Sequence, residues 1–541
     1  DTLSLLTSGF SARYGDRTAA ALVIQSREGG RLRPSARLTA SASNAGLLAE
    51  GPLSAARSGS WMVALRKSYL DYIIRRTSTD PSIAFGFLDA QVRVVYDLSP
   101  RHQLSLQAAA GDSALDRARF RQSLPLNSVM ASVSRLALAG LGLRYLPGPR
   151  LLVSAQLSGM SETFRDRNRE GAPLESGHYR EAAARADATF HWAPGRPLEF
   201  GAALRRLGDR GVRAQALAAG RYNEWERYRG AAWIAGGYLQ QSASWRRLQL
   251  AAGLRWDAFS PTGEVAVGAR AALRLALPAS QSLDFGWGQY SQFPEQQMLA
   301  GTASNPALSA ERALHYLAGW EWQPQERARL RLEFYHRQDR NALYRPWADP
   351  RWLPSGAIFR PSISSPWENA LRGHARGLEF LLQRRSANRL TGWLSYAYGR
   401  SQWRDARTGL RFPSDYDQRH TFNLYAGYRL RPSVHLSGRC LLGSGFPIPG
   451  FFRREGTRYL LAAGRNQLRL DPYQRLDLRI NKSFQTARRR LTLYGEIINL
   501  LNRRNARFSE LSGYSTRTGE AFLRFENMFP IIPSAGLVFE F

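Results

Sequence analysis

The sequence predicts an all-β protein, a transmembrane antiparallel β-barrel of about 22 strands that run up and down. Three observations support this prediction. Segments of roughly 8–12 residues alternate apolar and polar side chains. Short turns alternate with long connections, which is the pattern of an outer-membrane barrel with short periplasmic turns and long extracellular loops. No stretch approaches the ~20 consecutive apolar residues that a membrane helix requires.

Single segments show how inward and outward positions alternate along the predicted strands. In residues 475–481, Leu476 and Leu478 share one face, while Asp477 and Arg479 share the other. A charged side chain at every second position could not line a dry core without partners, but it can line a wet lumen. A large two-sheet sandwich or a propeller with one wet face would show similar alternation. A propeller also requires a blade repeat of about 40–50 residues, and no such repeat is found.

The predicted connections fall into two classes. The short turns are rich in Pro, Gly, Ser and Arg, and they lie at residues 98–103, 146–150, 192–197, 244–247, 277–281, 323–327, 385–389, 429–433 and 485–490. The long connections are expected at residues 69–87, 111–130, 158–180, 206–230, 290–312, 339–374, 402–419, 443–473 and 500–533.

The end of the chain, residues 534–541, forms the strand that we expect to close the barrel. Leu537, Phe539 and Phe541 share one face, and the last residue is aromatic, as expected at a bilayer interface. Pairing of this strand with residues 34–41 would remove the open edge of the sheet. Farther inside the barrel, Glu379 and Glu496 are predicted to face the lumen and to pair with arginines on neighbouring strands.

The chain is strongly basic, with 75 Lys and Arg against 43 Asp and Glu and a net charge of +32. Such a charge is typical of nucleic-acid binding, but here the basic residues are spread singly along the strands and form no dominant block. We therefore predict no nucleic-acid partner. The charge suits an anionic substrate, and it equally suits an anionic outer leaflet.

The residues that usually carry chemistry are sparse. The chain has one cysteine, Cys440, and eight histidines without a C-x-x-C or H-E-x-x-H motif. Asp417, Arg419 and His420 lie where a loop enters a strand, and they are read as an ion-pair and hydrogen-bond cluster, because no nucleophile accompanies them. The sequence predicts no enzyme, no catalytic residue, no metal site and no cofactor.

Residues 9–29 differ from the remainder of the chain. A polar turn at Tyr14–Arg17 precedes a short apolar strand at 20–24. These residues resemble the end of the plug domain of TonB-dependent outer-membrane receptors. Further stretches resemble barrel motifs of the same family, in the family's order, at 50–53, 66–71, 293–322, 375–383, 414–428, 443–450, 473–484, 493–505 and 529–541.

The resemblance implies two domains, with residues 1–30 as the remnant of a plug and its linker, and residues 31–541 as the barrel. It implies a receptor in the outer membrane of a Gram-negative bacterium that takes up a scarce solute, such as a siderophore, cofactor, glycan or peptide, into the periplasm. The sequence is expected to be cut from a longer protein whose upstream segment contacts TonB.

The resemblance also assigns roles to residues at both ends of the chain. Phe539 and Phe541 match the signal that the barrel-assembly machinery reads in this family. Tyr14, Asp16 and Arg17 are expected to form a turn against the barrel wall, between plug and barrel. Outer-membrane lipid and lipopolysaccharide are further expected partners. Two other functions stay open, namely a passive diffusion pore without a plug and a structural or adhesion barrel that acts through its long loops.

The predicted ligand region combines aromatic anchors with guanidinium donors, as recognition surfaces do. The candidate residues lie in three predicted loops, and they are Trp225, Arg227, Tyr228, Tyr344, Arg345, Trp347, Phe451, Phe452, Arg453 and Arg454. An alternative is that these residues pack on one another or contact lipopolysaccharide phosphates.

Overall fold

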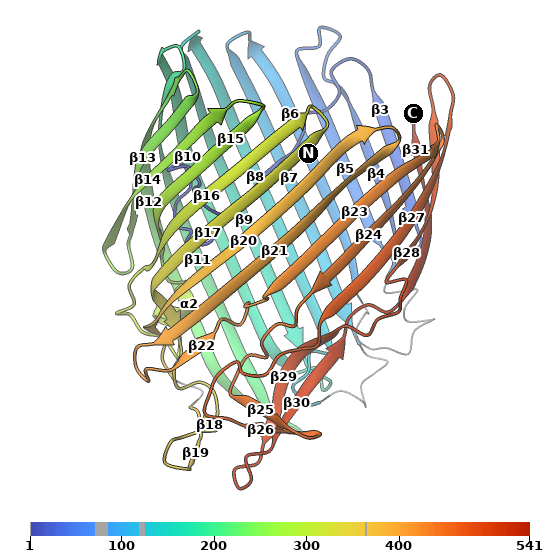
Figure 1. Cartoon of the computed structure of the whole chain (residues 1–541). Helices are drawn as coiled ribbons and strands as arrows, with labels where there is room; N and C mark the ends of the chain where they lie inside the picture. Colours follow the sequence, from blue (N-terminus) through green and yellow to red (C-terminus); the bar gives the residue numbers. More distant parts are fainter. Residues whose placement is uncertain (1, 71–84, 118–124, 363–364) are drawn as a thin grey trace.

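The computed structural model describes residues 2–70, 85–117, 125–362 and 365–541. Within them, one antiparallel sheet closes on itself as a barrel of 22 strands (Figure 1). Among these residues, no helix is long and apolar enough to cross a bilayer. The predicted fold class and the predicted number of strands are therefore confirmed.

The strands of the barrel follow one another around the ring in chain order. They are β3 (Ser35–Ser41), β4 (Asn44–Pro52), β5 (Gly59–Ser68), β6 (Phe85–Ser99), β7 (His102–Asp116), β8 (Ala131–Gly148), β9 (Leu151–Arg167), β10 (Pro173–Ala193), β11 (Arg196–Ala218), β12 (Arg221–Trp245), β13 (Leu248–Phe259), β14 (Glu264–Leu277), β15 (Gln281–Gln292), β16 (Glu311–Gln325), β17 (Ala328–Tyr344), β20 (Glu368–Ala387), β21 (Leu390–Asp405), β23 (His420–Arg431), β24 (Val434–Gly443), β27 (Tyr473–Gln485), β28 (Arg490–Ile498) and β31 (Ile532–Glu540). A short strand, β22 (Arg411–Pro413), pairs with the end of β21 beyond the residues that pair with β23.

Smaller elements do not belong to the ring of barrel strands. They are β1 (Thr2–Leu6), β2 (Ala21–Gln25), the short helix α2 (Gln296–Ala300), and three hairpins made by β18 (Arg351–Trp352) and β19 (Ile358–Phe359), by β25 (Phe452–Glu455) and β26 (Arg458–Leu461), and by β29 (Ala506–Tyr514) and β30 (Ala521–Asn527). The three hairpins gather at one end of the barrel, at the bottom of Figure 1. This end is called the loop end, and the opposite end is called the turn end.

Every predicted short turn contains an observed connection at the turn end. Residues 149–150 join β8 to β9, for example, and residues 246–247 join β12 to β13. Tight reversal requires left-handed backbone at several of these positions, as at Gly195 with φ 68° and Asn388 with φ 50°. Local turn chemistry therefore located this end of the molecule correctly.

Two of the predicted long connections are wrong. Residues 158–180 and 206–230 lie largely in strands β9 to β12. Within these two ranges, the connections are only residues 168–172, which join β9 to β10, and residues 219–220, which join β11 to β12. Their polar composition is typical of loops, but here the polar side chains pair with polar side chains on neighbouring strands. The Arg213 guanidinium, for instance, lies 2.9 Å from a carboxylate oxygen of Glu175 and 2.8 Å from one of Glu226.

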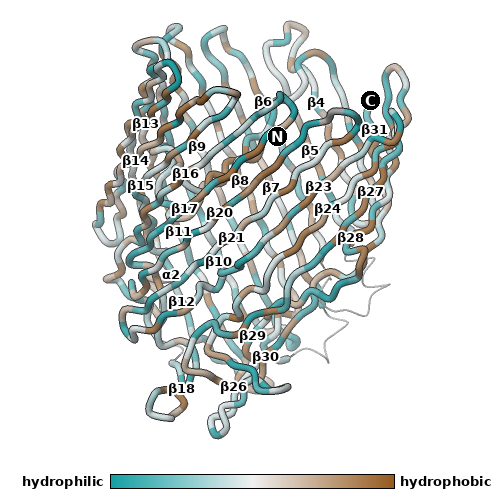
Figure 2. Tube along the Cα trace, viewed as in Figure 1, coloured by the Kyte–Doolittle hydropathy of each residue, from teal (hydrophilic) through white to brown (hydrophobic). Residues whose placement is uncertain are grey.

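The two faces of the strands carry different side chains, and Figure 2 shows hydrophobic and hydrophilic residues alternating along the ring. On β27, Ile480 is exposed on the outer face, while Arg479 faces the lumen and lies 3.1 Å from Glu496. The predicted partner of Glu496 is thus confirmed. Glu379 also lies on the inward side of its strand, since Leu378 and Leu382 are exposed on the other face. The arginine pairing predicted for Glu379 is wrong, because Arg331 pairs with Glu333, which lies opposite Glu379.

The barrel closes where β31 pairs with β3. Leu38 lies opposite Phe539, and Arg37 lies 2.5 Å from Glu540. The last residue takes part as well, since the Phe541 N–H donates to the Ala36 carbonyl oxygen at 3.0 Å and the Phe541 carbonyl oxygen accepts from the Ala36 N–H at 2.9 Å. The predicted closure against residues 34–41 is confirmed.

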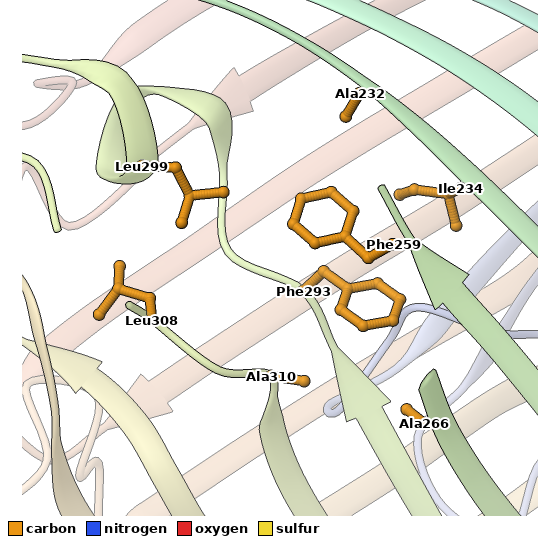
Figure 3. Close-up of a cluster of buried hydrophobic side chains, with 8 residues drawn as sticks. All are labelled: Ala232, Ile234, Phe259, Ala266, Phe293, Leu299, Leu308 and Ala310. Atoms are coloured by element: carbon orange, nitrogen blue, oxygen red, sulfur yellow. The ribbon is translucent and has the colours of Figure 1, made fainter. Parts of the chain in front are cut away.

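Apolar contacts at the loop end fold one long connection back into the barrel. Phe293 follows β15, and its ring stacks on that of Phe259 with centroids 4.7 Å apart (Figure 3). Leu299 of α2 and Leu308 complete the cluster with small residues of β12 and β14. Burial of these side chains holds residues 293–310 against the inner wall.

Deleting Phe541 is expected to impair closure of the barrel. The deletion removes both backbone hydrogen bonds with Ala36 and the ring that packs on Phe539, with a loss of about 2 kcal/mol or more at the seam. The amount of heat-modifiable folded barrel in outer-membrane fractions should fall severalfold. Phe541→Tyr keeps the backbone bonds and the ring, and it should assemble normally. Equal amounts of folded protein in the deletion would contradict the predicted role of the terminus.

Candidate functional site

The N-terminal tail, residues 2–25, lies against the inner wall of the barrel. Its two ends pair as β1 and β2, with Leu5 opposite Leu22. The predicted strand at 20–24 corresponds to β2, and β1 was not predicted. Between the two strands, the tail contacts side chains from β10 to β16.

Phe10 is a buried aromatic residue of the tail. Its ring lies 4.3 Å from that of Tyr290, and the Arg270 guanidinium stacks over both rings. Arg270 also donates to the carbonyl oxygens of Phe10, at 3.2 Å, and Ser11. His315 closes the other side of the Tyr290 ring. Aromatic stacking and donation to backbone carbonyls together fix this part of the tail.

Asp16 makes the second attachment of the tail. One carboxylate oxygen lies 3.0 Å from Nη1 of Arg205 on β11, and the other accepts the Phe293 N–H at 2.9 Å. Burial raises the pKa of Asp16 above its ordinary value, although the Phe293 N–H and the Arg205 guanidinium partly offset this effect. Asp16 has a φ of 53°, so the turn is left-handed at this residue.

The other two predicted contact residues of the turn differ from Asp16. Tyr14 is half-buried and packs edge-on against Phe10, with ring centroids 6.5 Å apart. Arg17 is exposed, and its guanidinium donates to the carbonyl oxygen of Asp16 at 3.1 Å. Of the three, Asp16 is the residue with hydrogen bonds to the wall.

A cavity of about 270 Å³ lies between the tail and the loop end. Thr18 of the tail lines it, and the Thr18 carbonyl oxygen lies 2.9 Å from Nε2 of His315. The strand ends of β16 and β17 and the loop residues after β22 and β26 supply the other walls. Its charged lining residues are Arg312, Arg337, Arg340, Arg465, Glu311, Asp339 and Asp415.

Arg465 joins the loops around this cavity. It is buried, its Nη1 lies 2.5 Å from Asp415, and its guanidinium stacks over the rings of Tyr344 and Phe412 at 5.5 and 5.3 Å. Burial opposes its charge, but Asp415 and Tyr344 raise the pKa of Arg465 above its ordinary value. Of the predicted ligand residues, Tyr344 lines this cavity. Sequence reasoning missed the exposed Tyr416, because residues 414–428 resemble a strand entry, and it missed Arg465, which lies within the predicted long connection 443–473.

A second arginine organises the predicted aromatic residues of the loops. The Arg351 guanidinium lies 4.7 Å from the ring centre of Trp347 and 4.9 Å from that of Phe451. Phe451 and Phe452 are 1% and 3% exposed, while Trp347 remains 38% exposed. Arg345 stacks over Trp367 and donates to the Ser365 carbonyl oxygen. These loops thus pack on one another, as in the alternative drawn from the sequence.

The remaining predicted ligand residues occupy two places. Arg453 and Arg454 are exposed on the β25–β26 hairpin, where Arg453 lies 2.9 Å from Glu455. Trp225, Arg227 and Tyr228 lie on strand β12 and not in a loop, which corrects the prediction. Tyr228 is buried, while Arg227 is exposed and lies 2.6 Å from Glu224.

Asp417 anchors a cluster where the loop enters β23. Its buried carboxylate accepts the Ser401 N–H at 2.6 Å and pairs with Arg419 at 2.7 Å and with Arg469. The His420 N–H donates to the Ser444 hydroxyl at 3.0 Å. Burial alone would raise the pKa of Asp417, but these donors hold it below its ordinary value of 3.8. The ion-pair reading of this motif is confirmed.

Metal-binding side chains do not gather in the described part of the chain, where no group of three or more His, Cys, Asp and Glu could hold an ion.

Comparisons with known proteins agree with the geometry. The model of the β-barrel of TonB-dependent receptor-like proteins matches residues 57–500. No curated protein sequence matches the chain.

Solved structures share the fold at low sequence identity. A mutant of the ferric enterobactin receptor PfeA from Pseudomonas aeruginosa is 14% identical, with a TM-score of 0.74 over 99% of this chain and 84% of that chain. The siderophore receptor PirA from Acinetobacter baumannii is 12% identical, with a TM-score of 0.72 over 99% and 84%. The copper transporter OprC is 13% identical, with a TM-score of 0.73 over 100% and 85%.

Arg270→Met is expected to release the tail. The change removes the donors to Phe10 and Ser11 but keeps apolar bulk between the rings. Charge-assisted hydrogen bonds of this kind contribute about 1.5–3 kcal/mol, so hydrogen exchange at the amides of residues 11–16 should accelerate roughly 10-fold or more. Arg274→Met on the same strand, which faces Asp284 away from the tail, is the matched control. Unchanged exchange in Arg270→Met would contradict the anchoring role.

The Asp417 cluster predicts an acid-sensitive loop end. Because the folded-state pKa lies below 3.8, the ionised carboxylate stabilises the loops above that pH. This stabilisation is lost as the pH falls through the folded-state pKa. Pepsin should therefore cut residues 444–472 increasingly as the pH falls from about 4 to 2. Asp417→Asn should be cut already at the upper pH, whereas Glu455→Gln, in an exposed pair, should behave as the unaltered protein. Equal cutting of all three proteins at every pH would refute this role.

Proposed function

This chain belongs to the family of TonB-dependent receptors, whose barrel model covers residues 57–500, and we propose that it takes up a scarce extracellular solute across the outer membrane. The loop end faces the exterior and the turn end faces the periplasm. The observation that carries the proposal is the cavity beneath the loops, because the tail forms part of its wall through Thr18.

A solute in this cavity contacts both the loops and the tail. Thr18 lies at the junction, since its N–H and hydroxyl lie 3.3 Å from the Gln292 side chain and its carbonyl oxygen contacts His315. Binding of a solute can thus affect the tail, which lies inside the lumen against β10 to β16. The attachments of the tail across β10 to β16 favour a gated path over a permanently open pore, and TonB would supply the force that breaks them.

The lining favours an anionic solute. Arg312 and Arg340 are exposed at the rim, and guanidinium groups bind carboxylates and other oxyanions with two parallel hydrogen bonds. Tyr416, 85% exposed, offers a free aromatic surface beside them. Structural neighbours are named as ferric enterobactin, siderophore and copper proteins. An anionic metal chelate with an organic, ring-containing scaffold is therefore our preferred solute class.

Uptake and its energy source can be tested together. Cells expressing the gene should accumulate one labelled member of a panel of catecholate, hydroxamate and carboxylate metal chelates, cobalamin, oligosaccharides and peptides. Accumulation should be lost when tonB is deleted. Accumulation that persists without TonB would instead identify a passive pore. Failure of the whole panel to bind, with binding of partner cells that depends on residues 345–367 and 444–472, would identify an adhesion barrel.

The charge of the cavity supplies a sharper test of the solute site. Arg312→Gln combined with Arg340→Gln should weaken binding of that solute to the purified protein at least roughly tenfold. Arg479→Gln removes an inward-facing arginine paired with Glu496 on the other side of the barrel, and it should leave the affinity unchanged. Equal affinity in all three proteins would place the solute elsewhere.

A further inference from the structure

The outer face of strands β8 to β12 carries a concentration of arginines near the loop end. Asp187 of β10 and Arg205 of β11 face the lumen, because both contact the tail. Side chains alternate along a strand, so His178 of β10 and Arg210 of β11 face outward. The same register holds for the outward positions of the neighbouring strands.

The register aligns these side chains in adjacent rows. In one row, Arg135, Thr163, His178, Arg210 and Arg229 lie directly opposite one another on five successive strands. Neighbouring strands are about 4.8 Å apart, so the cationic groups converge. The next row toward the loop end adds Arg165 of β9 and Arg227 of β12. These two rows are called the basic rows.

Few carboxylates compensate the basic rows. Within the described residues, Arg165, Arg210 and Arg229 have no acidic partner, whereas Arg135 and Arg227 at the two flanks each have one. At the centre, Nη2 of Arg210 lies 3.4 Å from the ring of His178. Arg180, one row farther toward the turn end, donates to the other ring nitrogen at 2.8 Å. Cations gathered at this spacing repel one another unless an anion joins them.

The surface next to the basic rows is apolar. The basic rows line a recess of about 910 Å³ on the outer wall. Toward the turn end, strands β7 to β13 line a second recess of about 670 Å³, where Leu141, Leu157, Leu204 and Trp256 are exposed. The outer wall therefore offers an apolar surface that is bordered, toward the loop end, by a cluster of guanidinium groups.

We propose that the basic rows bind the phosphorylated head group of an outer-leaflet glycolipid, lipopolysaccharide, whose acyl chains cover the apolar recess. Arginine forks suit phosphate oxygens, and several unpaired arginines in two rows suit a ligand with more than one phosphate. A zwitterionic phospholipid offers only one phosphate together with a cation, which the basic rows would repel. A second copy of this chain carries a net charge of +32 and would be repelled by these arginines.

The test uses the full chain, stripped of lipid in a neutral detergent, and lipid A with both phosphates as the probe. The variant carries Arg165→Gln, Arg210→Gln and Arg229→Gln. Its affinity for lipid A, measured by surface plasmon resonance and native mass spectrometry, should fall roughly 100-fold, at about fivefold for each of the three arginines. Lipid A without phosphates should bind the unaltered protein equally weakly.

The matched control removes three exposed arginines from short turns at the turn end of the barrel, which is distant from the basic rows. Its substitutions are Arg101→Gln, Arg150→Gln and Arg247→Gln. It should bind lipid A as the unaltered protein does. Heat-modifiable migration checks that each variant is folded, and Arg210→Gln alone replaces the triple variant if the latter does not fold. Undiminished binding by the folded variant would overturn the proposal. Equal binding of the phosphate-free lipid, or a dimer that dissociates in the variant, would overturn it as well.

Discussion

Closure of the sheet is the constraint on which the other features of this protein depend. In hydrocarbon, each unpaired backbone amide costs several kcal/mol, so the first strand of the ring must pair with the last. Reciprocal bonds between Ala36 and Phe541 complete that pairing at the final residue of the chain. Once the ring is closed, every strand must divide its side chains between lipid and lumen, and the division determines where charge can be placed.

The division of side chains between lipid and lumen explains where many of the arginines lie. Inside the lumen, arginines are matched by carboxylates on neighbouring strands, as Arg213 is by Glu175 and Glu226. Others hold the tail, as Arg270 does. Arg165, Arg210 and Arg229, which have no acidic partner among the described residues, are exposed on the outer wall near the loop end. Part of the net charge of +32 therefore lies on a surface that faces other molecules.

The strands, the short turns and the closing pair could be predicted from sequence, because each depends on period-2 alternation or on the chemistry of a few adjacent residues. The loop end could not. Strands β9 to β12 extend through polar segments because partners on neighbouring strands satisfy them, and those partners are invisible in one segment alone. The position of Arg465 depends on Asp415 and Tyr344, which belong to two other predicted connections. The pairing predicted for Glu379 is wrong for a similar reason, because Arg331 pairs with the neighbouring Glu333.

Phe293 contacts two parts of the molecule at once. Its ring belongs to the apolar cluster of the loop end, while its N–H is bonded to Asp16 of the tail. Phe293 therefore connects the apolar cluster of the loop end to the tail inside the lumen. By thermodynamic reciprocity, a solute that tightens residues 293–310 must change the free energy of detaching the tail by the same amount that tail detachment changes the solute's affinity. Solute affinity and the free energy of tail detachment are then two measurements of a single coupling energy.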